Sequence, residues 1–318
     1  MVISGIVPRR GGCPLAEDAL FLVASITKPV VCAGVMLLVQ EGRLSLDESV
    51  ADILPAFGAH GKGAVTVRHL MTHTSGLPDQ LEENVALRTR HAPLAEFVRA
   101  VYGLAPLFEP GSRVRYQSMG ILMLQEIVER LTGRALRDWL AERLFAPLGM
   151  RDARLGLPEG GLARTVYAHA SGDPLYGSDE TDWGWNSAYW RGLGAPWGGL
   201  HATADDLGTF LNHLLGEAPG PLSAAARRAM VRDQTAALPD LPPRDRLAER
   251  WGLGLRLGAR AYGDLASPQT FGHTGATGTL FWADPESRLA CVLLTNRPGA
   301  SRTLFPRFSN AVVAALAP

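Results

Sequence analysis

The stretch Phe21-Leu22-Val23-Ala24-Ser25-Ile26-Thr27-Lys28-Pro29 decides how the rest of the chain is interpreted, because it places a Ser-x-x-Lys pair where an apolar helix begins. Pro29 suits the first turn of a helix, where a missing N–H costs nothing. Residues 30–39 are apolar on nearly every side, and Gly42 follows as a typical helix end. We therefore expect a buried helix from Ser25 to about Glu41.

Ser25 and Lys28 are three residues apart and share one face of that helix. The unpaired N–H groups and the positive dipole end of a helix N-terminus favour a developing negative charge. Among 31 lysines and arginines only Lys28 and Lys62 are lysine, and a desolvated lysine can lose its proton whereas arginine cannot. The pair thus predicts a serine nucleophile with an amine beside it that accepts its proton.

Composition indicates the class of protein. The chain has 318 residues, of which 47% are hydrophobic and 19% charged, enough for one large domain or two interleaved ones. The formal net charge is zero, which argues against nucleic acid or an anionic membrane as a partner. Residues 1–13 lack the apolar region of a signal peptide, and the sequence Thr27-Lys28-Pro29 interrupts the apolar residues 19–39, so no membrane span is expected.

The three cysteines, Cys13, Cys32 and Cys291, are scattered and odd in number. They form neither a disulfide framework nor a zinc-binding spacing. A reducing compartment, and hence a cytoplasmic location, is expected.

Strand signals lie at both ends of the chain, with helical signals between them. Strands are predicted at residues 2–7, 251–257, 269–274, 279–283 and 289–295. Helices are predicted at residues 66–77, 119–131, 136–145, 204–215 and 302–316. This order predicts an α+β fold, with an antiparallel sheet flanked by helices and an inserted, mainly helical domain. The expected domain boundaries are 1–45 with 198–318 for the sheet domain, and 46–197 for the insertion.

Two features have more than one interpretation. His69 and His73 are four residues apart, as in zinc sites on one helical turn, but no glutamate follows His69 and no third ligand is evident. Structural histidines are therefore the favoured alternative. Residues 155–200 are irregular and rich in glycine and aromatic side chains. Such a loop either lines a functional site or caps the helical layer with its tryptophans.

Three further segments complete a pattern with Ser25 and Lys28. They are Phe108-Glu109-Pro110-Gly111-Ser112-Arg113-Val114-Arg115-Tyr116-Gln117-Ser118, Trp197-Gly198-Gly199-Leu200-His201-Ala202-Thr203-Ala204-Asp205-Asp206-Leu207 and Phe271-Gly272-His273-Thr274-Gly275-Ala276-Thr277-Gly278. Together they closely resemble the serine β-lactamase and penicillin-binding-protein superfamily, specifically its class C-like branch, which also contains esterases and D-amino-acid-type peptidases. The resemblance runs from about residue 20 to the C-terminus, and residues 68–77 and 146–150 are also typical of it. It implies the β-lactamase/transpeptidase-like fold.

The resemblance implies a role for each matching residue. Ser25 would be the nucleophile that becomes acylated, and Lys28 would hold Ser25 by a hydrogen bond and help to move its proton. Tyr116 would act as general base or relay and later protonate the leaving group. The backbone N–H groups of Ser25 and Ala276 would form the oxyanion hole. The substrate would contact Ser118, His273, Thr274 and Gly275. The reaction would need no metal or other cofactor.

Three departures from the family pattern bear on the substrate and the fold. Ser118 stands where the Tyr-x-Asn motif has asparagine, and a hydroxyl cannot offer both an amide donor and an amide acceptor. His273 stands where many members have lysine, and histidine is mostly neutral at pH 7. Both changes argue against efficient β-lactam recognition. Only 24 residues precede Ser25, where the family usually has a helix and two strands, so either the sheet lacks an edge or the natural protein begins earlier.

The sequence thus predicts a metal-independent serine hydrolase that acts through an acyl-enzyme on a small-molecule ester, amide or peptide. Slow β-lactam turnover is an expected side activity, and the oligomeric state is left open. The chain has no Gly-x-Ser-x-Gly elbow, which argues against an α/β-hydrolase. Two alternatives stay open: a non-catalytic recognition protein on the same fold, and a metallohydrolase built on His69 and His73.

Overall fold

The computed structural model describes residues 15–157, 164–238, 250–299 and 303–316, so the strand predicted at residues 2–7 lies outside the described residues. Within them, antiparallel strands form a three-stranded sheet of order β1-β3-β2 and a four-stranded sheet of order β4-β5-β6-β7. The strands are β1 (Phe21–Leu22), β2 (Arg154–Leu155), β3 (Leu200–Ala202), β4 (Arg256–Leu257), β5 (Phe271–Gly275), β6 (Thr279–Asp284) and β7 (Leu289–Leu294).

Helices make up most of the remainder and occupy the middle of the chain. They are α1 (Thr27–Gln40), α2 (Val50–Ile53), α3 (Val67–Met71), α4 (Asn84–Thr89), α5 (Leu94–Tyr102), α6 (Met119–Thr132), α7 (Leu136–Leu140), α8 (Ala146–Leu148), α9 (Ala188–Leu193), α10 (Ala204–Leu215), α11 (Ala224–Val231) and α13 (Leu304–Leu316). This content confirms the predicted α+β class. The division into a sheet domain and an inserted helical domain stays a prediction.

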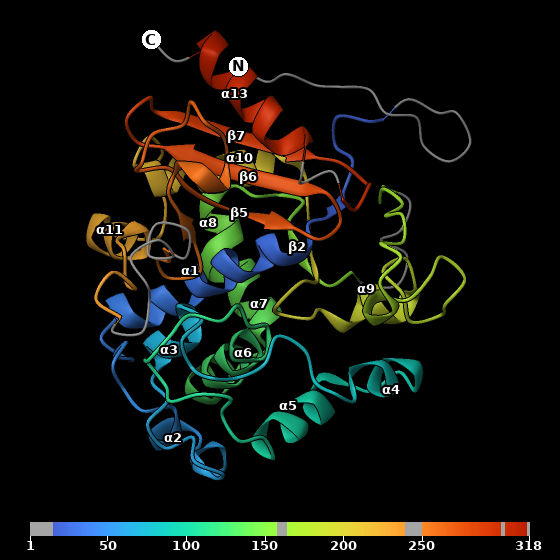
Figure 1. Cartoon of the computed structure of the whole chain (residues 1–318), viewed down its shortest axis with the longest axis vertical. Helices are drawn as coiled ribbons and strands as arrows, with labels where there is room; N and C mark the ends of the chain where they lie inside the picture. Colours follow the sequence, from blue (N-terminus) through green and yellow to red (C-terminus); the bar gives the residue numbers. More distant parts are fainter. Residues whose placement is uncertain (1–14, 158–163, 239–249, 300–302, 317–318) are drawn as a thin grey trace.

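The four-stranded sheet lies between helices, as Figure 1 shows. Strand β6 is buried along its whole length because its alternating side chains meet a helix on each face. Trp282 faces α13, where its indole N–H donates to the Ser309 hydroxyl (3.0 Å), whereas Phe281 stacks on Phe210 of α10. The two covered faces explain why β6 shows an almost continuous apolar sequence.

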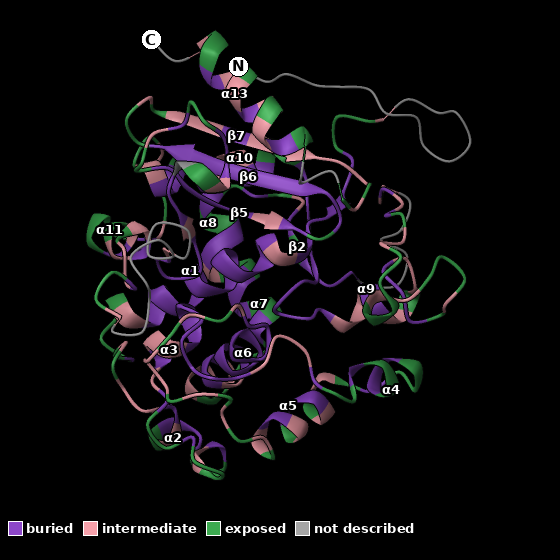
Figure 2. Cartoon of the chain, viewed as in Figure 1, coloured by how far each residue is buried: buried purple, intermediate pink, exposed green. Residues whose placement is uncertain are grey.

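Helix α1 passes through the centre of the molecule. Figure 2 shows it buried along most of its length, with exposed residues gathered on outer helices such as α4 and α13. It packs against α6 and against α11. This contact on several sides is the physical reason for the uniformly apolar sequence of residues 30–39. The buried helix predicted from Ser25 to about Glu41 is therefore confirmed, with a 3₁₀ turn at Ala24–Ile26 preceding the α-helical part.

Three sequence predictions need correction. The helix predicted over 66–77 ends at Met71, because the backbone leaves helical geometry at Thr72 and the Thr72 hydroxyl donates to the Arg68 carbonyl. The strand predicted over 251–257 is strand only at Arg256–Leu257, because the chain turns back on itself and Trp251 bridges Arg256. Gly254 allows that turn with a φ of +76°.

The third correction concerns the helix predicted over 136–145, which is α-helical only to Leu140 and continues as a π-helical turn over Ala141–Phe145. The sheet expected from both chain ends also differs in detail. Among the described residues, the N-terminal strand β1 pairs with β3, while the larger sheet is built wholly from C-terminal strands.

Candidate active site

Ser25 lies in the 3₁₀ turn between β1 and α1, half-buried at the end of the central helix. Ala24, just before it, has a φ of +47°, a left-handed conformation that costs energy for a residue with a Cβ. Thr27 holds this turn in place, because its hydroxyl donates to the Ala24 carbonyl (2.6 Å) and accepts from the Leu200 N–H (3.0 Å). The serine is thus fixed against β3.

Lys28 is the nearest basic group to Ser25. Its Nζ donates to Ser25 Oγ (2.9 Å) and to the Trp197 carbonyl (2.9 Å), and the side chain is 1% exposed. Burial lowers the pKa of Lys28 to about 8, against smaller opposing effects of Asp79 and Cys32. A substantial part of this lysine is therefore neutral near pH 8 and able to accept a proton.

Tyr116 lines both pockets beside Ser25 and also contacts Lys28. The Ser25 side chain acts on the pKa of the Tyr116 hydroxyl, and the Tyr116 ring centroid lies 4.8 Å from Lys28 Nζ. Burial is the main reason that the pKa of Tyr116 is raised well above its usual value. The phenol is therefore protonated at neutral pH and suited to donate a proton, whereas Lys28 is the better resting proton acceptor.

The segment around Tyr116 is held by the loop that follows α3. The Arg115 N–H donates to the His73 carbonyl (2.8 Å), and the Gln117 N–H donates to His73 Nδ1 (3.2 Å). The buried Gln117 amide donates to the carbonyls of His69 and Leu70 and accepts from the Ser75 hydroxyl. Gln117 thus anchors the chain on α3, while its neighbours Tyr116 and Ser118 face the site.

Ser118, which occupies the asparagine position of the motif, has a hydrogen-bond partner. Its hydroxyl donates to Asp79 Oδ1 (2.5 Å), and both residues line the same pocket as Ser25. The sequence pattern gave no sign of Asp79, because 39 positions separate it from Ser118. The pair thus brings a carboxylate next to the residue at the asparagine position of the motif.

The β5–β6 hairpin closes the other side of the site. The hydroxyl of Thr277 donates to the Leu22 carbonyl (2.6 Å), and that of Thr279 donates to the Val23 carbonyl (3.0 Å). A Cβ on Gly275 would lie 2.2 Å from the Val23 carbonyl oxygen, so only glycine permits this approach. The hairpin brings Ala276 into the wall of the pockets that contain Ser25.

His273 and Thr274 lie on β5, beside Ser25. The Nδ1 of His273 lies 2.7 Å from the Thr274 carbonyl, so this nitrogen carries the proton. Burial, followed by the charge of Lys28, lowers the pKa of His273 to about 3. His273 is therefore neutral at pH 7 and packs in an aromatic cluster with Tyr116, His73 and Trp251.

Two pockets flank Ser25. The larger, of about 330 Å³, lies along β5 and is bordered by Trp251, Tyr262 and His273. The smaller, of about 40 Å³, is bordered by Asp79, Arg88 and Ser118 and by tryptophans of the irregular loop. Trp185, Trp190 and Trp197 of that loop line this pocket, whereas Trp183 and Tyr189 do not. Part of the loop therefore lines the site.

His69 and His73 have structural partners. The Thr66 N–H donates to His69 Nδ1 (3.2 Å) in a capping box at the start of α3, and His73 Nδ1 accepts from Gln117. Burial lowers the pKa of both histidines. Within the part of the chain that the structure describes, no group of three or more His, Cys, Asp or Glu side chains could hold a metal ion.

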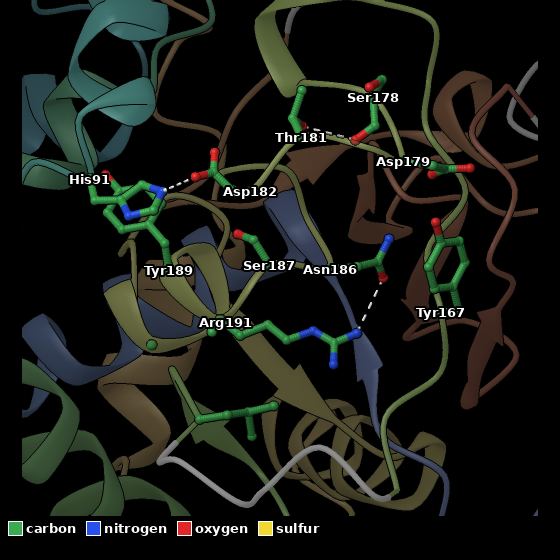
Figure 3. Close-up of a pocket in the computed structure, with 13 residues that line it drawn as sticks. His91, Tyr167, Ser178, Asp179, Thr181, Asp182, Asn186, Ser187, Tyr189 and Arg191 are labelled. Atoms are coloured by element: carbon green, nitrogen blue, oxygen red, sulfur yellow. Dashed lines mark hydrogen bonds and ion pairs between the residues drawn. The ribbon is translucent and has the colours of Figure 1, made fainter.

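A larger pocket, of about 1010 Å³, lies elsewhere and shares no lining residue with the two pockets around Ser25. Figure 3 shows its polar lining, in which His91 pairs with Asp182 (3.3 Å) and Arg191 donates to Asn186 (3.2 Å). It contains none of the candidate site residues. The candidate catalytic residues therefore line the two pockets at Ser25 and not this one.

Comparison with known proteins agrees with the motifs. The family model described as Beta-lactamase matches residues 5–315. Penicillin-binding protein 4 of Amycolatopsis lactamdurans is 32% identical over 308 residues, which are 92% of this chain and 76% of that protein. Esterase EstB of Burkholderia gladioli is 37% identical over 163 residues, which are 46% of this chain and 41% of the esterase. The chain thus aligns with less than half of that esterase.

The fold comparison gives the same result. The crystal structure of a penicillin-binding-protein homologue from Caulobacter crescentus superposes with a TM-score of 0.72 at 28% sequence identity, covering 90% of this chain and 80% of that one. The expected β-lactamase/transpeptidase-like fold is therefore confirmed.

Proposed function

The chain belongs to the β-lactamase family of serine hydrolases, and from this premise we propose that it cleaves ester or amide substrates through an acyl-enzyme on Ser25. The observation that carries the proposal is the 2.9 Å hydrogen bond from Lys28 Nζ to Ser25 Oγ, formed by a buried lysine whose pKa is lowered to about 8. A neutral amine in this position can take the proton that Ser25 loses on attack.

Acylation begins when Ser25 Oγ attacks the substrate carbonyl carbon and Lys28 accepts the hydroxyl proton. The carbonyl oxygen becomes negative and accepts hydrogen bonds from the backbone N–H groups of Ser25 and Ala276. The Tyr116 hydroxyl gives its proton to the leaving group as the scissile bond breaks, and the Lys28 ammonium returns a proton to the Tyr116 oxygen. Water then attacks the acyl-enzyme by the same steps in reverse, which frees the acid and restores Ser25.

The surroundings favour an esterase or an amidase/peptidase over a dedicated β-lactamase. His273 is neutral at pH 7, so it supplies no fixed positive charge for a substrate carboxylate. Ser118 is engaged with Asp79 and cannot present an amide to the substrate. Slow β-lactam turnover fits as a side activity of the same serine. We propose a small-molecule substrate, because both pockets at Ser25 are small.

The location of the protein stays a prediction. In the described residues no helix is long and apolar enough to cross a membrane.

Hydrolysis assays on the native chain test the proposal. Three substrates distinguish the classes: a neutral alkyl ester such as ethyl 4-methylpentanoate, a D-alanine amide and a chromogenic cephalosporin. We expect hydrolysis of the ester or the amide that is abolished in Ser25→Ala. The matched control is Ser45→Ala, which changes an exposed serine outside the site. No hydrolysis by well-folded native protein would instead support a non-catalytic recognition protein on this fold.

A further inference from the structure

Arg88 is a buried cation in the wall of the smaller pocket beside Ser25. It belongs to α4, far from Ser25 in sequence, and its side chain has no exposed surface. The mechanism above assigns it no role. Burying a charge is costly unless it is paired, so its presence calls for an explanation.

The protein holds the Arg88 guanidinium in a defined position. Its Cζ lies over the Trp190 ring, 4.1 Å from the ring centroid, and Nη1 donates to the Leu175 carbonyl (3.3 Å). Asn84, one turn earlier on α4, donates to the same carbonyl (3.3 Å). Stacking and these hydrogen bonds fix the group before any ligand arrives.

The opposite edge of the guanidinium is unused. Nε and Nη2 of Arg88 are buried and have no hydrogen-bond partner among the described residues. These two atoms carry the pair of parallel N–H bonds that binds a carboxylate in a bidentate manner. Two other lining residues also have a buried polar atom without a partner there, namely Trp190 (Nε1) and Gln80 (Oε1). Nε and Nη2 of Arg88 and Nε1 of Trp190 are donors that a bound acceptor would satisfy, whereas Oε1 of Gln80 is an acceptor and would need a donor.

The positive charge of Arg88 is not neutralised by the described part of the chain. Burial lowers the pKa of Arg88 to about 10, so it stays cationic at pH 7. No carboxylate of the described residues forms an ion pair with it. Asp79 lines the same pocket, but it accepts from Ser118, and its charge acts on Lys28, Tyr116 and Tyr176. Both charges act on Tyr176, but among the described residues no ion pair joins Asp79 to Arg88.

We propose that the Nε and Nη2 edge of Arg88 binds a carboxylate carried by the acyl part of the substrate, so that the enzyme prefers short half-esters or half-amides of dicarboxylic acids. The volume of about 40 Å³ fits this chemistry, because one water-sized probe needs roughly 10–15 Å³ and a carboxylate has three non-hydrogen atoms. The inference rests on the proposed function, since it requires Ser25 to be acylated by the group that occupies this pocket.

A pair of esters of matched shape tests the inference. Monoethyl succinate carries a carboxylate where ethyl 4-methylpentanoate carries an isopropyl group, so the two differ mainly in charge. Hydrolysis of each is followed by proton release at constant pH. For the native chain we expect kcat/KM to be about 10- to 100-fold higher for the succinate half-ester, from two charge-assisted hydrogen bonds. Equal values, or preference for the neutral ester, would overturn the inference.

Variants locate the effect at Arg88. In Arg88→Met the ratio of the two kcat/KM values should fall to about one or below, and in Arg88→Lys, which keeps the charge but loses the planar fork, it should be intermediate. The matched control is Arg90→Met, since Arg90 lies just after α4 and is exposed, with Glu96 as its partner. A ratio unchanged in Arg88→Met would contradict the assignment.

Two measurements cover the remaining outcomes. If Arg88→Met fails to fold, free succinate must still inhibit the native enzyme competitively towards the neutral ester, and 4-methylpentanoate must inhibit at least 10-fold more weakly. Preference for the cationic ester ethyl β-alaninate would point to Asp79 instead and overturn the inference. Hydrolysis of the neutral ester without any charge preference removes this inference alone, whereas no Ser25-dependent hydrolysis at all removes the proposed function as well.

Discussion

The lowered pKa of Lys28 predicts how activity depends on pH. Burial brings this pKa from 10.5 to about 8. At pH 7 the neutral amine is then about 300-fold more abundant than in a lysine whose pKa is 10.5. The neutral form accepts the Ser25 proton, so kcat/KM for a neutral ester should rise with pH through about 8 and level off above it.

Asp79 offers a perturbation of known sign. Its negative charge raises the pKa of Lys28, in opposition to burial. Asp79→Asn should therefore move the midpoint of the kcat/KM profile to lower pH. Asp182→Asn is the matched control, because Asp182 is an exposed carboxylate in the separate large pocket and should leave the midpoint unchanged.

The assay is a series of kcat/KM measurements on ethyl 4-methylpentanoate from about pH 6 to 10.5, a range that includes the ordinary lysine value. A flat profile, or a midpoint close to 10.5, would refute the reasoning about Lys28. A midpoint that moves upward in Asp79→Asn would refute the sign of the electrostatic argument.

Three further predictions concern single side chains. Tyr116→Phe keeps the ring but removes the proton donor, so kcat should fall about 10²- to 10⁴-fold; a kcat within threefold of native would contradict this role. Gly275→Ala forces β5 away from Val23, which should cost about 1–3 kcal/mol in thermal unfolding and lower kcat/KM, whereas the control Gly63→Ala, with open space at its Cβ, should do neither. Lys62→Met leaves the carbonyls of Ala59, Tyr102 and Leu104 without their buried donor and should lower the unfolding free energy by about 3 kcal/mol in urea titration; an unchanged value would count against a structural Lys62.

The sequence was sufficient to predict a helix or strand where the local pattern of apolar residues matches the burial of that element. The apolar run after Lys28 predicts α1 because that helix is covered on several sides, and the Thr203–Asp206 capping box marks the start of α10. The strand segments predicted near the C-terminus form β5, β6 and β7. In each case the residues that decide the element lie within it.

The sequence was insufficient where distant segments meet. Asp79 and Ser118 come together only because the loop after α3 lies against the start of α6, and no periodicity encodes that contact. Arg88 of α4 lines the pocket beside Ser25, and it is held there by the carbonyl of Leu175 in the irregular loop of residues 155–200. Gly254 interrupts a predicted strand with a tight turn at a φ of +76°, and Cys32 of α1 lies too close to it for a side chain. Each difference arises from tertiary packing that overrides local preference.

Lys62 shows that the rarity of lysine in this chain does not by itself distinguish a candidate catalytic lysine from a structural one. Lysine is rare in this chain, and both lysines are buried. Lys28 holds a serine hydroxyl, whereas Lys62 donates to three backbone carbonyls, an arrangement that suits a compact ammonium better than a planar guanidinium. Rarity thus indicates a special environment, and only the contacts distinguish chemistry from structure.

The central claim is that Ser25 is an activated nucleophile, and intact-mass measurement after exposure to a fluorophosphonate probe tests it most directly. The native chain should gain one adduct, and Ser25→Ala should gain none. Labelling of the native chain should also become faster as pH rises through about 8, as Lys28 loses its proton. No adduct on well-folded native protein, or an equal adduct on Ser25→Ala, would contradict the account.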